Sequence, residues 1–194
     1  MPAGRIARVV ADLKVLPRQF WLLAAAIFVY LIGVDMSYPY EALYLNSRLD
    51  VSMTTVGLIL GATMFATLPM HVVGGALCDK LGRRAVLLIA MLGSMTLYTG
   101  LGLTRDLGVI VALITFEAAF GWAQFITSSN AMVADLTPPE GRAEAYSVSR
   151  VALNAGAVIA AVIALPLLAA DPSFRLNFLA SGAVCGIVFV MVLV

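Results

Sequence analysis

Residues 74–84, GGALCDKLGRR, decide how this chain folds. One acidic and three basic residues fall within six positions of this stretch: Asp79, Lys80, Arg83 and Arg84. The apolar runs on either side, residues 56–73 and 85–103, contain no Asp, Glu, Lys or Arg. Charge confined between two apolar runs of this length is typical of a short loop that joins two transmembrane helices. The stretch therefore predicts an integral membrane protein.

The composition of the whole chain supports this interpretation. Hydrophobic residues make up 62% of the 194 residues, charged residues make up 12%, and the mean hydropathy is +1.00. A soluble domain is about half apolar and about a quarter charged, and a chain of this length has too little interior to hide the excess. The net charge of +1 and the lack of a basic face argue against nucleic acid as a partner. The partner expected from composition is the lipid bilayer.

Six segments are long and apolar enough to span a membrane, since one span needs about 20 mostly apolar residues. An amphipathic, basic lead-in at the membrane surface is expected before them, over residues 1–19. The predicted helices cover roughly residues 20–45, 54–77, 84–103, 107–134, 143–169 and 174–194. The apolar GLILG of residues 57–61 has the spacing of a helix-packing motif.

The Lys and Arg residues fall unequally on the two sides of these spans. Nine belong to the side of the N-terminus and of the GGALCDKLGRR loop, and three belong to the other side: Arg48, Arg105 and Arg175. Short loops rich in Lys and Arg stay in the cytoplasm. We therefore expect a cytoplasmic N-terminus, in a prokaryotic cytoplasmic membrane.

The spacing in the charged loop resembles the signature loop between the second and third helices of the major facilitator superfamily. The matching residues are Gly75, Asp79, Gly82, Arg83 and Arg84. The first span, with Gly33 and Pro39, is similar to that of efflux-type, drug/proton antiporter-like members. The resemblance implies an all-α integral membrane fold, with six transmembrane helices as two inverted three-helix repeats. It also implies that this chain is an N-terminal half, with the C-terminal six-helix bundle following residue 194.

Two positions depart from that family's pattern. Glu117, four residues before Gly121, stands where the family often has an arginine, and Ala160 and Ala161 occupy the place of a Gly-Pro pair in the fifth span. The departures leave a lipid or lysolipid flippase, or an uncoupled facilitator, open as alternatives to proton-coupled efflux. The arginine replacement favours a cationic or neutral small-molecule substrate over an anionic one.

The charged loop is expected to act as a conformational latch and not as a substrate site. Gly75 permits close helix approach and Gly82 permits a tight turn. The resemblance implies that Asp79 accepts hydrogen bonds from a helix N-terminus in the C-terminal half. Arg83 is expected to pair with Asp79 and with Asp135. Arg84 completes the latch set.

Two carboxylates lie near the middle of the predicted spans, where a charge costs roughly 2.5–3.5 kcal/mol and is a functional candidate by default. Asp35 lies about 11 residues and Glu117 about 10 residues from the outer ends of their spans, so both are expected roughly 15 Å deep. We expect them to couple transport to proton movement. Glu41 lies nearer the outer mouth, where a solvated role and a functional role are both open. Gln124 and Asn154 are polar enough to face a cavity, although interhelical hydrogen bonding explains them equally well.

An intramembrane enzyme is disfavoured. The chain has one histidine, His71, and no G-x-S-x-G motif, whereas a buried Ser–His pair is needed for a serine protease. No metal-ligand spacing is present, and no cofactor is expected beyond a proton gradient as the energy source. The sequence thus predicts a secondary active transporter for proton-coupled efflux of a small lipophilic or cationic compound. A stand-alone six-span subunit that dimerises is a further alternative.

Overall fold

The computed structural model describes residues 16–193, and these residues form helices without any β-strand. The α-helices are α2 (Arg18–Asp35), α3 (Glu41–Leu49), α4 (Met53–Leu81), α5 (Arg83–Leu103), α6 (Leu107–Glu117), α7 (Ala123–Leu136), α8 (Arg142–Ala170) and α9 (Arg175–Leu193). Three short elements complete the order: the 3-10 turns η1 (Tyr38–Tyr40) and η3 (Pro139–Gly141), and the π-helical η2 (Ala118–Trp122). Most of the predicted lead-in, residues 1–15, lies outside the described residues.

Six helical units are long and apolar enough to cross a membrane, as predicted. They are Arg18–Leu49, Met53–Leu81, Arg83–Leu103, Leu107–Leu136, Pro139–Ala170 and Arg175–Leu193. Several extend beyond the expected limits because the connecting turns are short. The first span continues to Leu49 and ends at Asp50, which adopts a left-handed conformation with φ 54°.

The stretch GGALCDKLGRR was predicted to be a short loop. It consists instead of two helix ends around one residue. Asp79 and Lys80 lie in the last turn of α4, and α5 begins at Arg83. The connector is Gly82 alone, with φ 86°, a backbone conformation that a residue without a Cβ adopts readily. Charge is concentrated here because the helix ends reach the membrane surface with almost no intervening chain.

The six spans pack in the pattern expected of two inverted repeats. The first span contacts the fifth and sixth, through α2 against α8 and α9, and the fourth contacts the second and third, through α7 against α4 and α5. The third and sixth spans, α5 and α9, pack against each other. Exchanging spans 1–3 with spans 4–6 preserves this pattern. The all-helical, six-span half-bundle predicted from the sequence is therefore confirmed.

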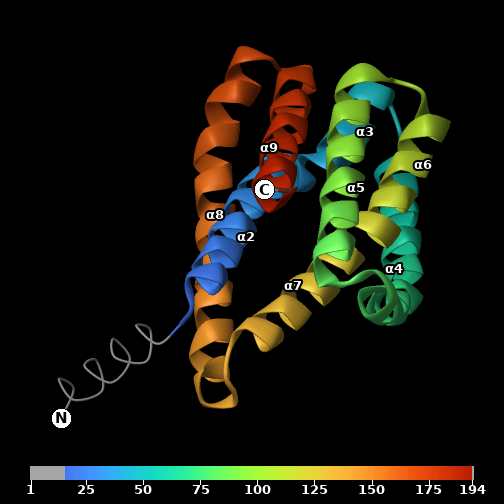
Figure 1. Cartoon of the computed structure of the whole chain (residues 1–194). Helices are drawn as coiled ribbons and strands as arrows, with labels where there is room; N and C mark the ends of the chain where they lie inside the picture. The colour runs from blue at the N-terminus through green and yellow to red at the C-terminus, as the bar shows by residue number, and fades with distance from the viewer. Residues whose placement is uncertain (1–15, 194) are drawn as a thin grey trace, which may run out of the picture.

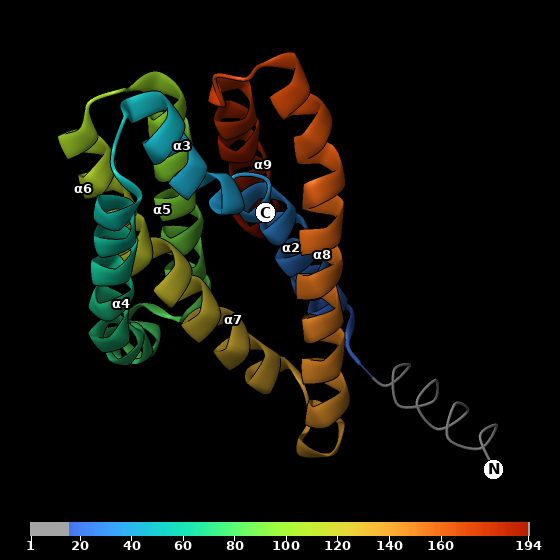
Figure 2. The same cartoon turned by 180° about the vertical axis from the view of Figure 1, so that it is seen from behind.

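Figures 1 and 2 show α2, α8 and α9 on one side, α4, α5 and α6 on the other, and α7 running diagonally between the two groups. The core between them contains large, fully buried side chains that include Tyr30, Tyr98, Phe125 and Phe178. By contrast, α4 and α8 leave bulky apolar side chains such as Phe65 and Val158 exposed. These two helices provide apolar surface for lipid or for further protein.

Candidate functional site

The first span is interrupted directly after Asp35, the last residue of α2. Pro39 lies four residues later, where its ring removes the hydrogen bond to the Asp35 carbonyl and clashes with it. The chain therefore leaves the α-helix and forms the turn η1 before α3 resumes the span. Asn177 of α9 supports the interruption, because its Nδ2 donates to the Met36 carbonyl at 2.6 Å and to Ser37 Oγ at 3.0 Å.

The fourth span is interrupted directly after Glu117, the last residue of α6. The next five residues form the π-helix η2, an irregularity that is frequent at functional sites. The amide of Gln124 supports this interruption, since its Nε2 donates to the Ala119 carbonyl at 2.9 Å and to the Met70 carbonyl of α4 at 3.1 Å. Backbone groups freed within a membrane span need such partners.

Asp35 and Glu117 thus occupy equivalent places near the middle of two corresponding spans, each at a helix break stabilised by a buried amide side chain. Broken helices of this kind form substrate and ion sites in secondary transporters. Both carboxylates are half-buried within the described chain. The two sites differ in their connections.

Glu117 ends a chain of hydrogen bonds that crosses three spans. Ser94 Oγ of α5 donates to Glu117 Oε1 at 2.9 Å, and Tyr30 Oη of α2 lies 2.6 Å from Ser94 Oγ. Since the Ser94 hydroxyl has one hydrogen and gives it to Glu117, Tyr30 must donate to Ser94. The Tyr30 ring is fixed by stacking on Phe125, with ring centroids 4.0 Å apart.

The direction of this chain depends on the protonation state of Glu117. A carboxylate can only accept a hydrogen bond, whereas a protonated carboxyl can also donate one. Protonation of Glu117 therefore allows both hydroxyls to rotate, so that hydrogen-bond donation can run in the opposite direction, from α6 to α2. This arrangement can transmit a proton-binding event at the fourth span to the first span without breaking the packing.

The carboxyl group of Asp35 makes no hydrogen bond or ion pair with any described residue. Glu41 is buried, with 4% of its surface exposed, and its Oε1 has no hydrogen-bond partner within residues 16–193. The solvated role left open for Glu41 is therefore wrong. Its carboxyl lies in the interior of the bundle, at the first turn of α3.

The two amides proposed for the cavity have different surroundings. Gln124 is fully buried and its donor is used by α4 and η2, so it is an interhelical support. Asn154 is exposed on α8, and its Nδ2 donates to the Arg150 carbonyl of the same helix at 2.8 Å. His71 of α4 makes an interhelical contact with α7, with Nδ1 3.3 Å from Thr127 Oγ1.

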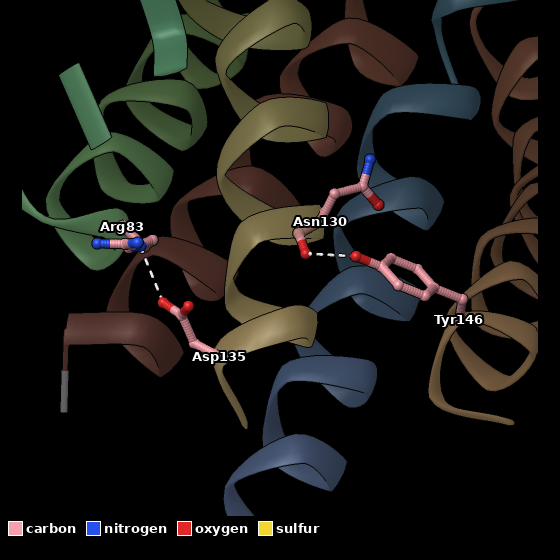
Figure 3. Close-up of polar contacts among 4 residues, drawn as sticks. All are labelled: Arg83, Asn130, Asp135 and Tyr146. Carbon is pink, nitrogen blue, oxygen red and sulfur yellow. Dashed lines mark hydrogen bonds and ion pairs between the residues drawn. The ribbon is translucent and has the colours of Figure 1, made fainter. Parts of the chain in front are cut away.

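At the Gly82 turn, Arg83 Nε lies 2.8 Å from Asp135 Oδ2, an ion pair that joins α5 to the end of α7 (Figure 3). Its two side chains are 41% and 52% exposed, and it is the one ion pair within 4 Å among the described residues. Asp79 is exposed, and the expected second pair with Arg83 is absent there. Figure 3 also shows the Tyr146 hydroxyl of α8 donating to the Asn130 carbonyl of α7 at 3.1 Å.

Arg84 and Gly75, also members of the latch set, differ in their surroundings from what the sequence suggested. Arg84 donates from Nε to the Val192 carbonyl at 2.8 Å and from Nη2 to the Leu193 carbonyl at 2.6 Å, which ties α5 to the end of α9. A Cβ added at Gly75 would meet no described atom within 4 Å. The close approach expected at Gly75 is therefore not made within the described chain. The neighbouring Gly74 lies against Gln124 instead.

The family model described as Major Facilitator Superfamily matches residues 23–194. The chain belongs to this superfamily. An uncharacterized MFS-type transporter of Bacillus subtilis, YttB, is 28% identical over 91% of this chain and 44% of its own length. An uncharacterized MFS-type transporter of Mycobacterium tuberculosis is 30% identical over 84% of this chain and 38% of its own length. The multidrug resistance protein MdtH of Edwardsiella ictaluri is 28% identical over 79% of this chain and 38% of its own length.

The chain thus spans less than half the length of these major facilitator relatives. Three residues of the site were not predicted from the sequence, because their roles depend on contacts between spans: Tyr30, Ser94 and Asn177. A serine or tyrosine in an apolar helix carries no local signal for its partner. Their polarity could have identified them as candidates, because a polar group inside a membrane span needs a hydrogen-bond partner. Among residues 16–193, no cluster of three His, Cys, Asp or Glu side chains is arranged as a metal site.

Proposed function

We propose that this chain is the N-terminal half of a secondary active transporter that exports a small lipophilic or cationic compound in exchange for protons. The observation that carries the proposal is the hydrogen bond from Ser94 Oγ to Glu117 Oε1, continued to Tyr30. It links an ionisable group at one broken helix to the span that contains the other. The name of the MdtH relative, a multidrug resistance protein, favours export as the direction of transport.

Alternating access would use the two broken spans in turn. Glu117 binds a proton in one state and releases it in the other, and Asp35 provides the second carboxyl at the equivalent break. A lipophilic cation is the substrate class that two intramembrane carboxylates accommodate best, because opposite charge offsets the cost of burying each charge.

The Gly82 turn serves as the conformational latch in this proposal. Arg83 and Asp135 hold the ends of the third and fourth spans together, while Asp79 remains exposed at the end of α4. An exposed carboxylate at this point is available to a helix N-terminus of the C-terminal half, where negative charge is favoured.

The test is transport by the complete protein in proteoliposomes, with ethidium as the lipophilic cation and an imposed pH gradient. Glu117→Gln and Asp35→Asn are compared with wild type, and Glu140→Gln, which alters an exposed carboxylate in η3, is the matched control. Gradient-driven flux should be lost in the first two variants and kept in the control. Flux without any gradient dependence in wild type would support the uncoupled facilitator. Unchanged gradient dependence in both variants would refute coupling through these carboxylates.

A further inference from the structure

The three arginines at the end of the bundle opposite the Gly82 turn line one pocket. Arg48 belongs to the end of α3, Arg105 to the turn between α5 and α6, and Arg175 to the start of α9. The pocket has a volume of about 290 Å³ and its wall also carries hydroxyl groups, from Ser47, Thr104 and Ser173. Arg48 and Arg175 lie at the ends of the first and sixth spans, and Arg105 lies in the turn between the third and fourth. Three separate parts of the chain thus contribute one arginine each to the same pocket.

No carboxylate in the described chain forms an ion pair with these three arginines. No acidic residue lines the pocket, and none of the three guanidinium groups has a described carboxylate within 4 Å. Two of the acidic residues near these arginines in the sequence accept hydrogen bonds from backbone groups. Asp171 accepts from the backbone of Ser173 and Leu176 at 3.0 and 2.8 Å, and Asp106 caps α6 by accepting from Val109 N at 2.9 Å.

The arginines also retain unused donors. Arg48 donates from Nε, at 3.1 Å, and from Nη2 to the Pro172 carbonyl, which fixes its side chain and leaves Nη1 unused. Arg105 and Arg175 make no side-chain hydrogen bond with any described residue. Guanidinium groups with free N–H donors match the geometry of phosphate oxygens, and Arg48 is already held in place.

We propose that this pocket binds the phosphate group of an anionic phospholipid. It lies at the ends of the spans, where lipid headgroups lie, and Leu103 in its wall is 66% exposed and can contact the acyl chains. Basic pockets between transmembrane helices on the cytoplasmic side bind anionic headgroups, and this pocket offers the same chemistry at the other membrane surface. With the orientation expected from the Lys and Arg distribution, the site faces the outer leaflet. A bound headgroup would bridge the first, third and sixth spans.

The test uses the complete protein purified in detergent, with dioleoylphosphatidylglycerol, dioleoylphosphatidylcholine and sodium phosphate as separate probes. Native mass spectrometry reports retained lipid, and thermal unfolding reports stabilisation. The informative variant is Arg105→Gln with Arg175→Gln, since it removes charge without removing a protein contact. Arg142→Gln with Arg150→Gln is the matched control, because both residues are exposed on α8 and lie away from the pocket.

Wild type and the control should each retain phosphatidylglycerol in preference to phosphatidylcholine. The Arg105/Arg175 variant should bind phosphatidylglycerol roughly ten- to thirtyfold more weakly, since each cation near the membrane surface strengthens anionic lipid binding by about fivefold. Arginine-dependent stabilisation by sodium phosphate, with no preference for phosphatidylglycerol, would identify a free-phosphate site and overturn the lipid assignment. Equal phosphatidylglycerol retention by wild type and both variants would overturn the pocket itself.

Discussion

Asp35 and Glu117 each end an α-helical segment in the middle of a span, and the two spans correspond under the inverted-repeat pattern of the bundle. The causes of the two breaks differ. Pro39 removes a backbone hydrogen bond in the first span, whereas the fourth span widens into a π-helix over Ala118–Trp122. The outcome is the same, because each break places a carboxyl group beside irregular backbone that a buried amide stabilises.

Ser94→Ala should reduce gradient-driven flux about tenfold or more, because it removes a hydrogen bond to an ionisable group whose contribution is about 1.5–3 kcal/mol. Ser94→Thr retains the hydroxyl and should retain most of the flux. The measurement is ethidium transport in proteoliposomes with and without a pH gradient, which separates coupling from general damage. If Ser94→Ala and Ser94→Thr behave alike, the Tyr30–Ser94–Glu117 chain has no role in coupling.

Replacing either supporting amide by leucine should lower the free energy of unfolding by about 1–3 kcal/mol, the cost of leaving a buried carbonyl unpaired. The variants are Gln124→Leu and Asn177→Leu, both at fully buried positions. Asn154→Leu is the control, since that exposed amide donates only within α8, and its effect should stay within about 0.5 kcal/mol. Thermal unfolding in detergent measures the three. Equal effects at all three positions would show that the breaks need no side-chain support.

Gly156→Ala should be destabilising, because the added Cβ would lie 2.6 Å from the Phe28 carbonyl oxygen and 2.8 Å from Leu31 Cβ. Both atoms belong to α2, so the fifth and first spans would have to separate, at a cost of about 1–3 kcal/mol. At Gly61 the added Cβ meets no described atom within 4 Å. Gly61→Ala should instead be neutral or gain up to about 1 kcal/mol from helix propensity. The reverse order of stabilities would contradict the helix contacts described here.

These glycines show what the sequence could and could not predict. Apolar length and charge placement predicted six spans and their order, since both depend on local sequence. The GLILG spacing predicted a packing face, yet neither Gly57 nor Gly61 has a described atom within 4 Å of an added Cβ. Gly93 and Gly156 do pack closely, the first against Gly121 of η2. Which glycine meets a neighbour depends on how the spans are rotated, and that rotation is set by the whole bundle.

In the candidate site, too, local sequence predicted some features, whereas others depend on the packing of the whole bundle. Asp35 and Glu117 stood out because a carboxylate in an apolar span is costly wherever it lies. Glu41 was harder to place, because its burial arises from the continuation of the first span to Leu49. The role of Gln124 depends on a π-helix that no local pattern announces.

The connection between the fifth and sixth spans should respond to acid through Asp171. Hydrogen bonds from the Ser173 side chain and from the backbone of Leu176 and Ser173 hold the pKa of this carboxyl below its ordinary value of 3.8. A lowered pKa in the folded state contributes stability above the ordinary value, and this contribution is lost as the pH falls through the folded-state value. Asp171→Asn should therefore unfold at a lower temperature than wild type near neutral pH. The difference should shrink below about pH 4, and a difference that grows on acidification would contradict this assignment.

The ion pair between Arg83 and Asp135 should matter for transport and very little for stability. Both side chains are about half exposed, and an exposed pair contributes about 0–1 kcal/mol. Arg83→Gln should therefore leave the unfolding temperature almost unchanged while reducing flux. Reversing the pair, with Arg83→Asp and Asp135→Arg together, should restore part of the flux, and the acidic residue at the start of α5 then also suits the helix dipole.

Asp79→Asn provides the second half of this test, because Asp79 makes no ion pair within the described chain. If Asp79 contacts the C-terminal half as proposed, Asp79→Asn should lose flux while its affinity for ethidium stays within about twofold. The reason is that a latch residue contributes to the change of state and not to the substrate site. The affinity is measured by equilibrium binding to the complete protein. The isolated chain of residues 1–194 should then show the same unfolding temperature with Asp or Asn at this position. A large loss of ethidium affinity, with a loss of flux no greater than the loss of affinity, would place Asp79 in the substrate site and refute the latch.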